Sequence, residues 1–296
     1  MSGKKIIKEL SLGYSPCPND TAIFYALVHE KVHTRGLAFK EELADVEALN
    51  QKGLKGLLDV TKISFHAYCH MRDQYVLLRS GAALGKGCGP LLVGREPMDP
   101  KDLKGRKIAI PGGLTTANLL FTLFAGSLGW PSFGENPAFS KKNLIPMLFS
   151  DIMPAVKEGR ADAGLVIHEG RFTFENYGLH RLMDLGQWWE EETGFPIPLG
   201  GIAARRSLGS QTIKSVGAAI RESILYTLGK PHEARDYIRG HAQEMEDSVI
   251  NSHIGLYVNE HTVSLNEEGE RAIEELFARA VKAGLARASS SPLFIA

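Results

Sequence analysis

Short apolar segments alternate with amphipathic helical segments along most of the chain, and this alternation restricts the fold more than any other feature. The helical segments place their apolar residues on one face, and from Gln211 onward the pattern is almost wholly helical. Five apolar runs have the length of buried strands: 6–11, 59–63, 91–93, 107–110 and 163–167. Strands that alternate with helices predict an α/β fold with mainly parallel sheets.

A weak internal repeat favours two lobes over one large domain. Residues 45–63 read as a helix that ends at a glycine, followed by a strand that begins with aspartate, and residues 151–167 repeat this order. Chance similarity between two αβ units would give the same pattern. A chain of 296 residues also exceeds what most single cores accommodate.

Two short, extended segments flanked by glycine, Gly89–Arg95 and Pro198–Arg205, are candidate hinge crossings between the lobes. Residues 1–95 and 200–296 then form a discontinuous first lobe with a helical C-terminal part, and residues 96–199 form an inserted second lobe. Because α/β sheets bind ligands at the carboxyl ends of their strands, we expect the active-site cleft between the lobes.

Composition argues against several function classes. Lysine plus arginine equals aspartate plus glutamate, 34 each, whereas nucleic-acid proteins carry a strongly basic face. The first ten residues contain no apolar signal segment, and the longest apolar stretch, 119–125, is far shorter than the ~20 residues of a membrane span. Three widely spaced cysteines do not form a disulfide framework. We therefore expect a cytoplasmic protein without nucleic-acid or membrane partners.

Two predicted helix N-termini are candidate sites for an acidic ligand. The segment Gly112–Ala117 follows a strand and opens a helix, so that hydroxyls and free N–H groups face the cleft. The segment Thr61–Ser64 repeats this arrangement with one cation, Lys62, and one capping hydroxyl, Ser64. Plain helix capping by Thr115 and a solvated surface lysine at position 62 are the alternatives.

His168 is the strongest catalytic candidate, since it directly follows the run 163–167 at a strand's carboxyl end. Its unperturbed pKa of ~6.5 suits a general base at neutral pH. Glu169 and Arg171 either orient this histidine or pair with each other. A purely structural histidine is the alternative.

Two prolines stiffen the loop that precedes the first helix, Ser15–Asp20. Asp20 is the expected N-cap of that helix, and Asn19 is a candidate supporting residue of the cleft. Cys17 lies near the helix N-terminus, where a thiol pKa can fall. Because neither histidine nor a second cysteine flanks Cys17, a nucleophilic role is disfavoured.

Three other motifs offer weaker signals. The glycine-rich segment Gly81–Gly89 lacks the spacing of a P-loop and of a dinucleotide fingerprint. His66 and His70, with Cys69 between them, have a spacing that metals use, but no third ligand motif accompanies them. Trp188 and Trp189 are more typical of core packing between the lobes than of substrate stacking.

Six segments resemble the 1,4-dihydroxy-6-naphthoate synthase family of the futalosine route to menaquinone: Ser15–Leu27, Thr61–Ser64, Arg79–Gly85, Val166–Glu169, Trp188–Glu190 and Pro196–Gly200. The resemblance runs nearly end to end. The chain departs from the family pattern by an insertion around residues 134–142 and by His66, Cys69 and His70 in the helix after Ser64.

This resemblance implies a two-lobed, periplasmic-binding-protein-like (type II) fold with two hinge crossings. It implies a lyase that converts cyclic dehypoxanthinyl futalosine, a carboxylated small molecule, to 1,4-dihydroxy-6-naphthoate and dihydroxyacetone without metal or other cofactor. His168 is then the proton acceptor. The expected substrate contacts are Thr61, Lys62, Ile63, Ser64, Thr116 and Ala117, and the possible supporting residues are Asn19, Thr115, Glu169 and Arg171.

Two alternatives share this fold: a binding protein for small carboxylates and the sister enzyme chorismate dehydratase. A third, metal-dependent hydrolysis at His66 and His70, predicts inhibition by chelators. We expect a monomer or a homodimer.

Overall fold

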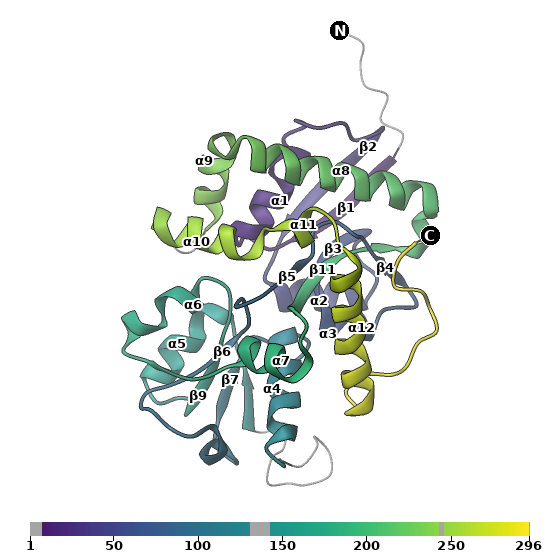
Figure 1. Cartoon of the computed structure of the whole chain (residues 1–296). Coiled ribbons are helices and arrows are strands. Elements are labelled where there is room, and N and C mark those ends of the chain that lie inside the picture. Colours follow the sequence, from purple (N-terminus) through teal and green to yellow (C-terminus); the bar gives the residue numbers. More distant parts are fainter. Residues whose placement is uncertain (1–7, 131–142, 243–245, 296) are drawn as a thin grey trace.

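The computed structural model describes residues 8–130, 143–242 and 246–295, and within them the strands form two separate sheets (Figure 1). The first sheet has the order β2-β1-β3-β11-β4, with β5 also paired to β11. Its strands are β1 (Lys8–Tyr14), β2 (Leu37–Leu43), β3 (Val60–Ser64), β4 (Tyr75–Leu77), β5 (Ala83–Gly85) and β11 (Ile197–Arg205). We call the elements built around this sheet lobe 1.

The second sheet has the order β10-β6-β9-β7-β8, and the elements around it form lobe 2. Its strands are β6 (Leu91–Gly94), β7 (Ile108–Ile110), β8 (Leu144–Pro146), β9 (Ala163–Val166) and β10 (His180–Asp184). The α/β alternation is confirmed, but the expectation of mainly parallel sheets is wrong. The strands next to the crossings, β6 and β11, pair antiparallel with their neighbours, so both sheets are mixed.

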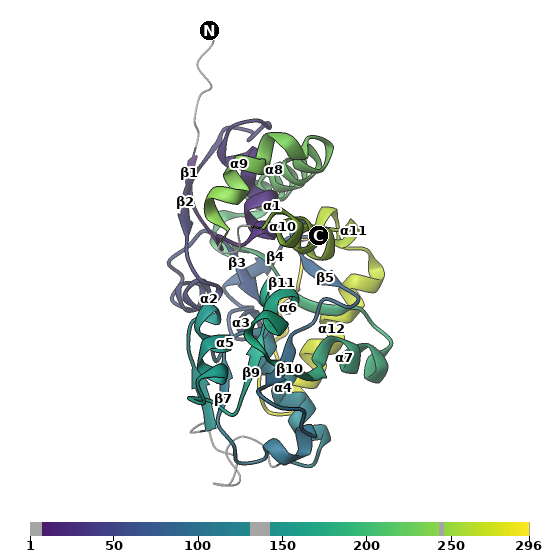
Figure 2. The ribbon, with the colours of Figure 1, turned by 90° about the vertical axis from the view of Figure 1, so that its left-hand side faces the viewer.

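The helices cover both sheets, and the C-terminal part is helical as expected (Figures 1 and 2). Lobe 1 carries α1 (Pro18–Val28), α2 (Val46–Leu54), α3 (Phe65–Cys69), α8 (Ser210–Gly229), α9 (Pro231–His241), α10 (Asp247–Tyr257), α11 (Glu260–Val263) and α12 (Glu267–Lys282). Lobe 2 carries α4 (Thr116–Ser127), α5 (Phe149–Lys157), α6 (Gly170–Thr173) and α7 (Leu185–Thr193). Short 3-10 helices span Pro100–Leu103, Phe174–Tyr177 and Arg206–Leu208.

The chain crosses between the sheets twice, once between β5 and β6 and once between α7 and β11. All of β6 belongs to the second sheet, so the first crossing precedes Leu91 instead of ending at residue 95. All of β11 belongs to the first sheet, so the second crossing lies before Ile197. Both segments expected as crossings are therefore paired strands.

The apolar core continues from one lobe into the other. One cluster joins Phe65 of lobe 1 with Phe121 and Trp189 of lobe 2, and α12 packs against α3 and β11 as well as α4. Trp188 and Trp189 are both buried in this cluster, which confirms the core-packing interpretation. The insertion around residues 134–142 lies outside the described residues.

None of the helices in the described ranges combines the length and the apolar character that a membrane span requires.

Candidate active site

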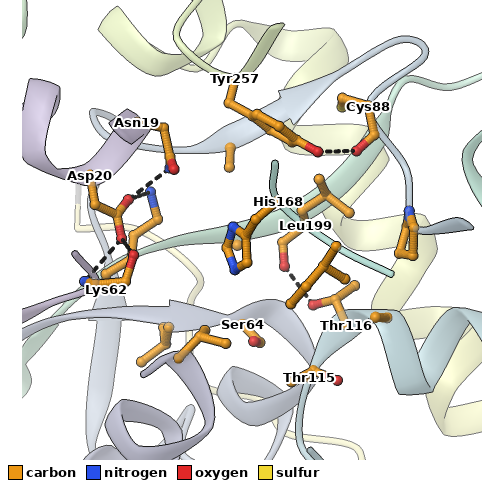
Figure 3. Close-up of a pocket in the computed structure, with 18 residues that line it drawn as sticks. Asn19, Asp20, Lys62, Ser64, Cys88, Thr115, Thr116, His168, Leu199 and Tyr257 are labelled. Carbon is orange, nitrogen blue, oxygen red and sulfur yellow. Dashed lines mark hydrogen bonds and ion pairs between the residues drawn. The ribbon is translucent and has the colours of Figure 1, made fainter. Parts of the chain in front are cut away.

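A cavity between the two lobes collects side chains from segments far apart in the sequence (Figure 3). Lobe 1 lines it with the β1–α1 loop, the end of β3, part of β11 and α10, and lobe 2 lines it with the N-terminus of α4 and the segment after β9. The polar and sulfur-bearing residues of its lining are Ser15, Asn19, Asp20, Lys62, Ser64, Cys88, Thr115, Thr116, His168 and Tyr257.

His168 lies in the middle of this cavity (Figure 3). It follows the fully buried strand β9 and adopts a left-handed backbone with φ of 55°. Non-glycine residues rarely take this conformation, and it costs on the order of 1–3 kcal/mol. The ring contacts Phe149 edge-on, with centroids 5.1 Å apart. The fold therefore holds an imidazole at the cavity in a strained backbone, as active sites often do.

The N-terminus of α4 also faces the cavity. Thr115 is its N-cap, and its Oγ accepts a hydrogen bond from Asn118 N (3.3 Å), so the alternative of helix capping by Thr115 is confirmed. The Thr116 hydroxyl donates to the carbonyl of Leu199 (2.5 Å) and is thus occupied by the chain. The first backbone N–H groups of a helix have no partner within it, so the N–H groups of Thr116 and Ala117 remain suited to an anion.

Lys62 and Asp20 form a buried ion pair beside the cavity, with 2.8 Å between Nζ and Oδ1. The interpretation of Lys62 as a solvated surface lysine is therefore wrong. Asp20 is not the N-cap of α1, because the helix begins at Pro18 with Cys17 as its N-cap. Instead its carboxylate accepts hydrogen bonds from the Ser15 hydroxyl (2.7 Å) and the Asn19 amide (2.9 Å).

Asn50 of α2 joins the end of β3 to lobe 2, since its amide nitrogen also donates to the carbonyl of Leu114 (3.4 Å). Its amide nitrogen donates to Ser64 Oγ (3.1 Å), and its oxygen accepts from Ser64 N (2.9 Å). Ser64 precedes α3 as expected, but its side chain makes no capping bond there. Across the cleft, Glu47 accepts a hydrogen bond from Leu114 N (3.1 Å). Gly112 lies so close to Glu47 that a Cβ would approach the carboxyl group to 2.5 Å.

Three predicted site residues do not line the cavity. Thr61 is fully buried, and its hydroxyl donates to the carbonyl of Lys62. Arg171 pairs with Asp184 (2.5 Å) and donates to the carbonyl of Gly89 (2.6 Å), so it secures the crossing before β6. Glu169 is buried and has no ion pair with Arg171. Of the two relationships expected, a Glu169–Arg171 ion pair is therefore excluded. The Glu169 carboxylate instead has an oxygen within 4.8 Å of a ring nitrogen of His168.

Two aromatic residues of α10 that the sequence did not predict for the site lie at or behind the cavity. Tyr257 lines the cavity, and its hydroxyl donates to the carbonyl of Cys88 (3.2 Å). His253 lies one turn earlier, fully buried behind His168, with nearly parallel rings 6.1 Å apart. The i, i+4 spacing of two polar aromatics on an otherwise apolar helix face was the available signal, but nothing in the sequence placed α10 beside residue 168.

Metal-ligand atoms of Cys17, His168 and Glu169 lie within 4.8 Å of one another, and no other such group occurs in the described parts of the chain. Burial raises the pKa of the Cys17 thiol well above its usual value, and Glu169 adds to this effect. The thiol is thus protonated at neutral pH, which argues against a nucleophile. His66, Cys69 and His70 do not form such a group; the Cys69 thiol donates to the carbonyl of Phe65.

Comparison with known proteins places this geometry in context. A family model described as menaquinone biosynthesis matches residues 10–282. A 1,4-dihydroxy-6-naphthoate synthase of Thermus thermophilus is 48% identical over 98% of this chain and 100% of its own length. A protein of the same name from Streptomyces coelicolor is 46% identical over 93% of this chain and 94% of its own length.

Solved structures agree on the fold. A crystal structure of an Archaeoglobus fulgidus protein superposes with a TM-score of 0.84 at 33% identity, over 96% of this chain and 100% of that one. The periplasmic aliphatic sulphonate binding protein SsuA of Escherichia coli superposes with a TM-score of 0.64 at 14% identity, over 95% and 89% of the two chains. The fold is therefore the two-lobed, periplasmic-binding-protein-like type that the sequence resemblance implied.

Proposed function

The chain belongs to the menaquinone biosynthesis family, and from this premise we propose that it is a 1,4-dihydroxy-6-naphthoate synthase. Its substrate is cyclic dehypoxanthinyl futalosine, and its products are 1,4-dihydroxy-6-naphthoate and dihydroxyacetone. The observation that carries the proposal is the position of His168, which meets the cavity opposite polar groups of both lobes. We expect the reaction in the cytoplasm, with the protein as a monomer or homodimer.

The cavity offers different partners to the two ends of such a substrate. The N–H groups of Thr116 and Ala117 at the start of α4 suit the carboxylate, because unpaired N–H groups and the helix dipole favour negative charge. Lys62 has three N–H donors, of which Asp20 and the carbonyl of Gly81 take two. The third, with Ser64 alongside, is available to the sugar-derived hydroxyl groups.

His168 acts as the general base of a retro-aldol-like cleavage. It takes the proton of a substrate hydroxyl, and the electron pair of that O–H bond forms a new carbonyl group. The carbon–carbon bond then breaks, and its electron pair passes into the remaining ring. Loss of dihydroxyacetone lets that ring become aromatic, which supplies most of the driving force. Electrons are only rearranged within the substrate, so the step calls for no redox cofactor.

The direct test incubates the purified protein with cyclic dehypoxanthinyl futalosine and, separately, with chorismate. We expect chromatography to detect the naphthoate and dihydroxyacetone in equal amounts from the first compound and no turnover of the second. His168→Ala should cut turnover by ~100-fold or more, as the loss of a general base does.

The same experiment separates the alternatives. A binding protein would return the first compound unchanged, and a chorismate dehydratase would consume chorismate. Either result would reject the proposed reaction.

A further inference from the structure

His253 of α10 brings a polar side chain of lobe 1 next to Glu169 of lobe 2. Its side chain is fully buried, and its ring packs against Tyr257, with centroids 4.6 Å apart. Its Nε2 lies 2.9 Å from Asn19 Oδ1, and its Nδ1 lies 3.8 Å from Glu169 Oε2. Both views show α10 beside α6, so this contact joins the two lobes (Figures 1 and 2).

The neighbouring hydrogen bonds fix which nitrogen of His253 carries the proton. The Asn19 amide nitrogen donates to the carboxylate of Asp20, which Lys62 and Ser15 hold from the other side. Asn19 therefore turns its oxygen toward His253, and an amide oxygen can only accept a hydrogen bond. The Nε2 of His253 must carry the hydrogen, and a neutral ring then has a bare, accepting Nδ1.

Two buried acceptors consequently face each other across the lobe boundary. Neither His253 Nδ1 nor Glu169 Oε2 has a hydrogen-bond partner among the described residues. Buried polar atoms are nearly always paired, so this gap indicates a contact that is completed in another state of the enzyme. An approach of about 1 Å, to a normal hydrogen-bond length, together with one proton taken up from solvent and shared between the two atoms, would complete it.

Glu169 lies where it can transmit this contact to the base. One of its carboxylate oxygens is within 4.8 Å of both a ring nitrogen of His168 and the Cys17 thiol. His168 is the preceding residue in the chain, and its ring stacks nearly parallel to that of His253, with 11° between the planes. A shift of Glu169 therefore moves the carboxylate that flanks the base.

We propose that His253 is a positioning residue of the active site: its Nδ1 forms a hydrogen bond with the carboxyl group of Glu169 when the lobes close on substrate, and this bond sets Glu169 against His168. The proposal rests on the function given above. His253 does not line the cavity and touches no reacting atom, so its effect falls on turnover and not on substrate affinity. Misplacement of a catalytic group by about 1 Å can cost ~100-fold in rate.

Two amide variants test the contacts of the two ring nitrogens of His253 separately. In His253→Gln the amide reaches the Nε2 position and keeps the bond to Asn19, but nothing occupies the Nδ1 position. In His253→Asn the shorter amide occupies the Nδ1 position instead. We expect His253→Gln to lower kcat at least 10-fold with KM within threefold of wild type, and His253→Asn to recover at least fivefold of that loss.

A double-mutant cycle with Glu169→Leu, which leaves no hydrogen-bonding atom on the side chain, tests the contact itself. If the two side chains act as a unit, the double variant is no slower than the slower single variant. His232→Gln, an exposed histidine on α9, is the matched control and should match wild type. Thermal unfolding of every variant detects misfolding, and Glu169→Leu alone, with lower kcat and unchanged KM, carries the test if His253→Gln does not fold.

Failure of the proposed function and failure of the role of His253 give different results. A wild-type protein that forms no naphthoate rejects the proposed function. Normal kcat in His253→Gln, equal losses in the Gln and Asn variants, or fully additive losses in the cycle reject the role of His253 while the function stands.

Discussion

Lys62 Nζ lies 2.8 Å from Asp20 Oδ1, and the side chains of both residues are less than a tenth exposed. The lysine comes from the end of β3 and the aspartate from the first turn of α1, so the pair links two elements that are distant in sequence. Asp20 in turn orients Asn19, which holds His253. One buried charge pair thus supports the polar wall of the cavity and, through Asn19, the position of His253 behind His168.

Loss of this pair should destabilise the fold. Asp20→Asn leaves a buried ammonium without its counter-charge, and such an uncompensated charge costs about 3–5 kcal/mol of unfolding free energy. Urea denaturation at pH 7 measures this. The control is Arg160→Gln, whose partner is Glu158 in a pair more than half exposed, and there we expect a change below about 1 kcal/mol. Equal changes in the two variants would contradict the prediction.

The strained backbone of His168 predicts that this residue lowers the unfolding free energy of the protein. Both His168→Ala and His168→Gly should lose turnover, but glycine accepts the left-handed backbone without strain. We expect His168→Gly to exceed His168→Ala in unfolding free energy by about 1 kcal/mol. At the exposed helix position Arg221, the alanine variant should instead be more stable than the glycine variant, because glycine weakens a helix interior by about 1 kcal/mol relative to alanine. The same order at both positions would argue against strain at His168.

The proposed binding of the substrate carboxylate at the N-terminus of α4 can be tested at the first residue of that helix. Thr116→Pro removes the hydroxyl and the N–H group, and proline is tolerated there because Thr115 already has an extended backbone. Thr116→Val removes only the hydroxyl that Leu199 uses. We expect KM to be at least 10-fold higher in the proline variant than in the valine variant, which corresponds to about 1.4 kcal/mol of substrate-binding free energy. Steady-state kinetics decides, and equal KM values would place the carboxylate elsewhere.

His66 should make stability fall at mildly acidic pH. Burial, with a smaller contribution from His70, lowers its pKa from 6.5 to about 4. Between those values the unfolded chain binds the proton and the folded protein does not, so unfolding free energy declines as pH falls through this window. His66→Gln should lose roughly 2 kcal/mol less than wild type between pH 7 and pH 5. Urea denaturation at both values checks this, and His232→Gln should behave as wild type.

Chelation should leave the reaction intact. The proposed step uses a base and hydrogen-bond donors of the chain, and Cys69 does not join His66 and His70 in a ligand group. Turnover after dialysis against EDTA should stay within twofold of the untreated enzyme. A loss greater than 10-fold that added Zn²⁺ restores would instead support a metal role, and His66→Gln and Cys17→Ser would then show which cluster holds the ion.

Local sequence determined the elements and several of their ends. Apolar runs identified the buried strands. The segment Gly113-Leu114-Thr115-Thr116 predicted the start of α4, since capping depends on residues a few positions apart. The motif around His168 pointed to a strand end, and the structure has His168 two residues after β9. These features follow from short-range periodicity and side-chain chemistry.

Tertiary packing alone decided the partners of those residues. Asp20 was expected to cap a helix, and Lys62 was expected to contact substrate or, alternatively, to be a solvated surface lysine. Each is instead buried against the other, because β3 runs beside the segment that leads into α1. Arg171 forms its ion pair with Asp184 and not with Glu169. His253, which lies 84 positions after Glu169 in the chain, contacts it in the folded protein. Charge pairing and burial depend on distances that only the folded chain creates, and no spacing in the sequence encodes them.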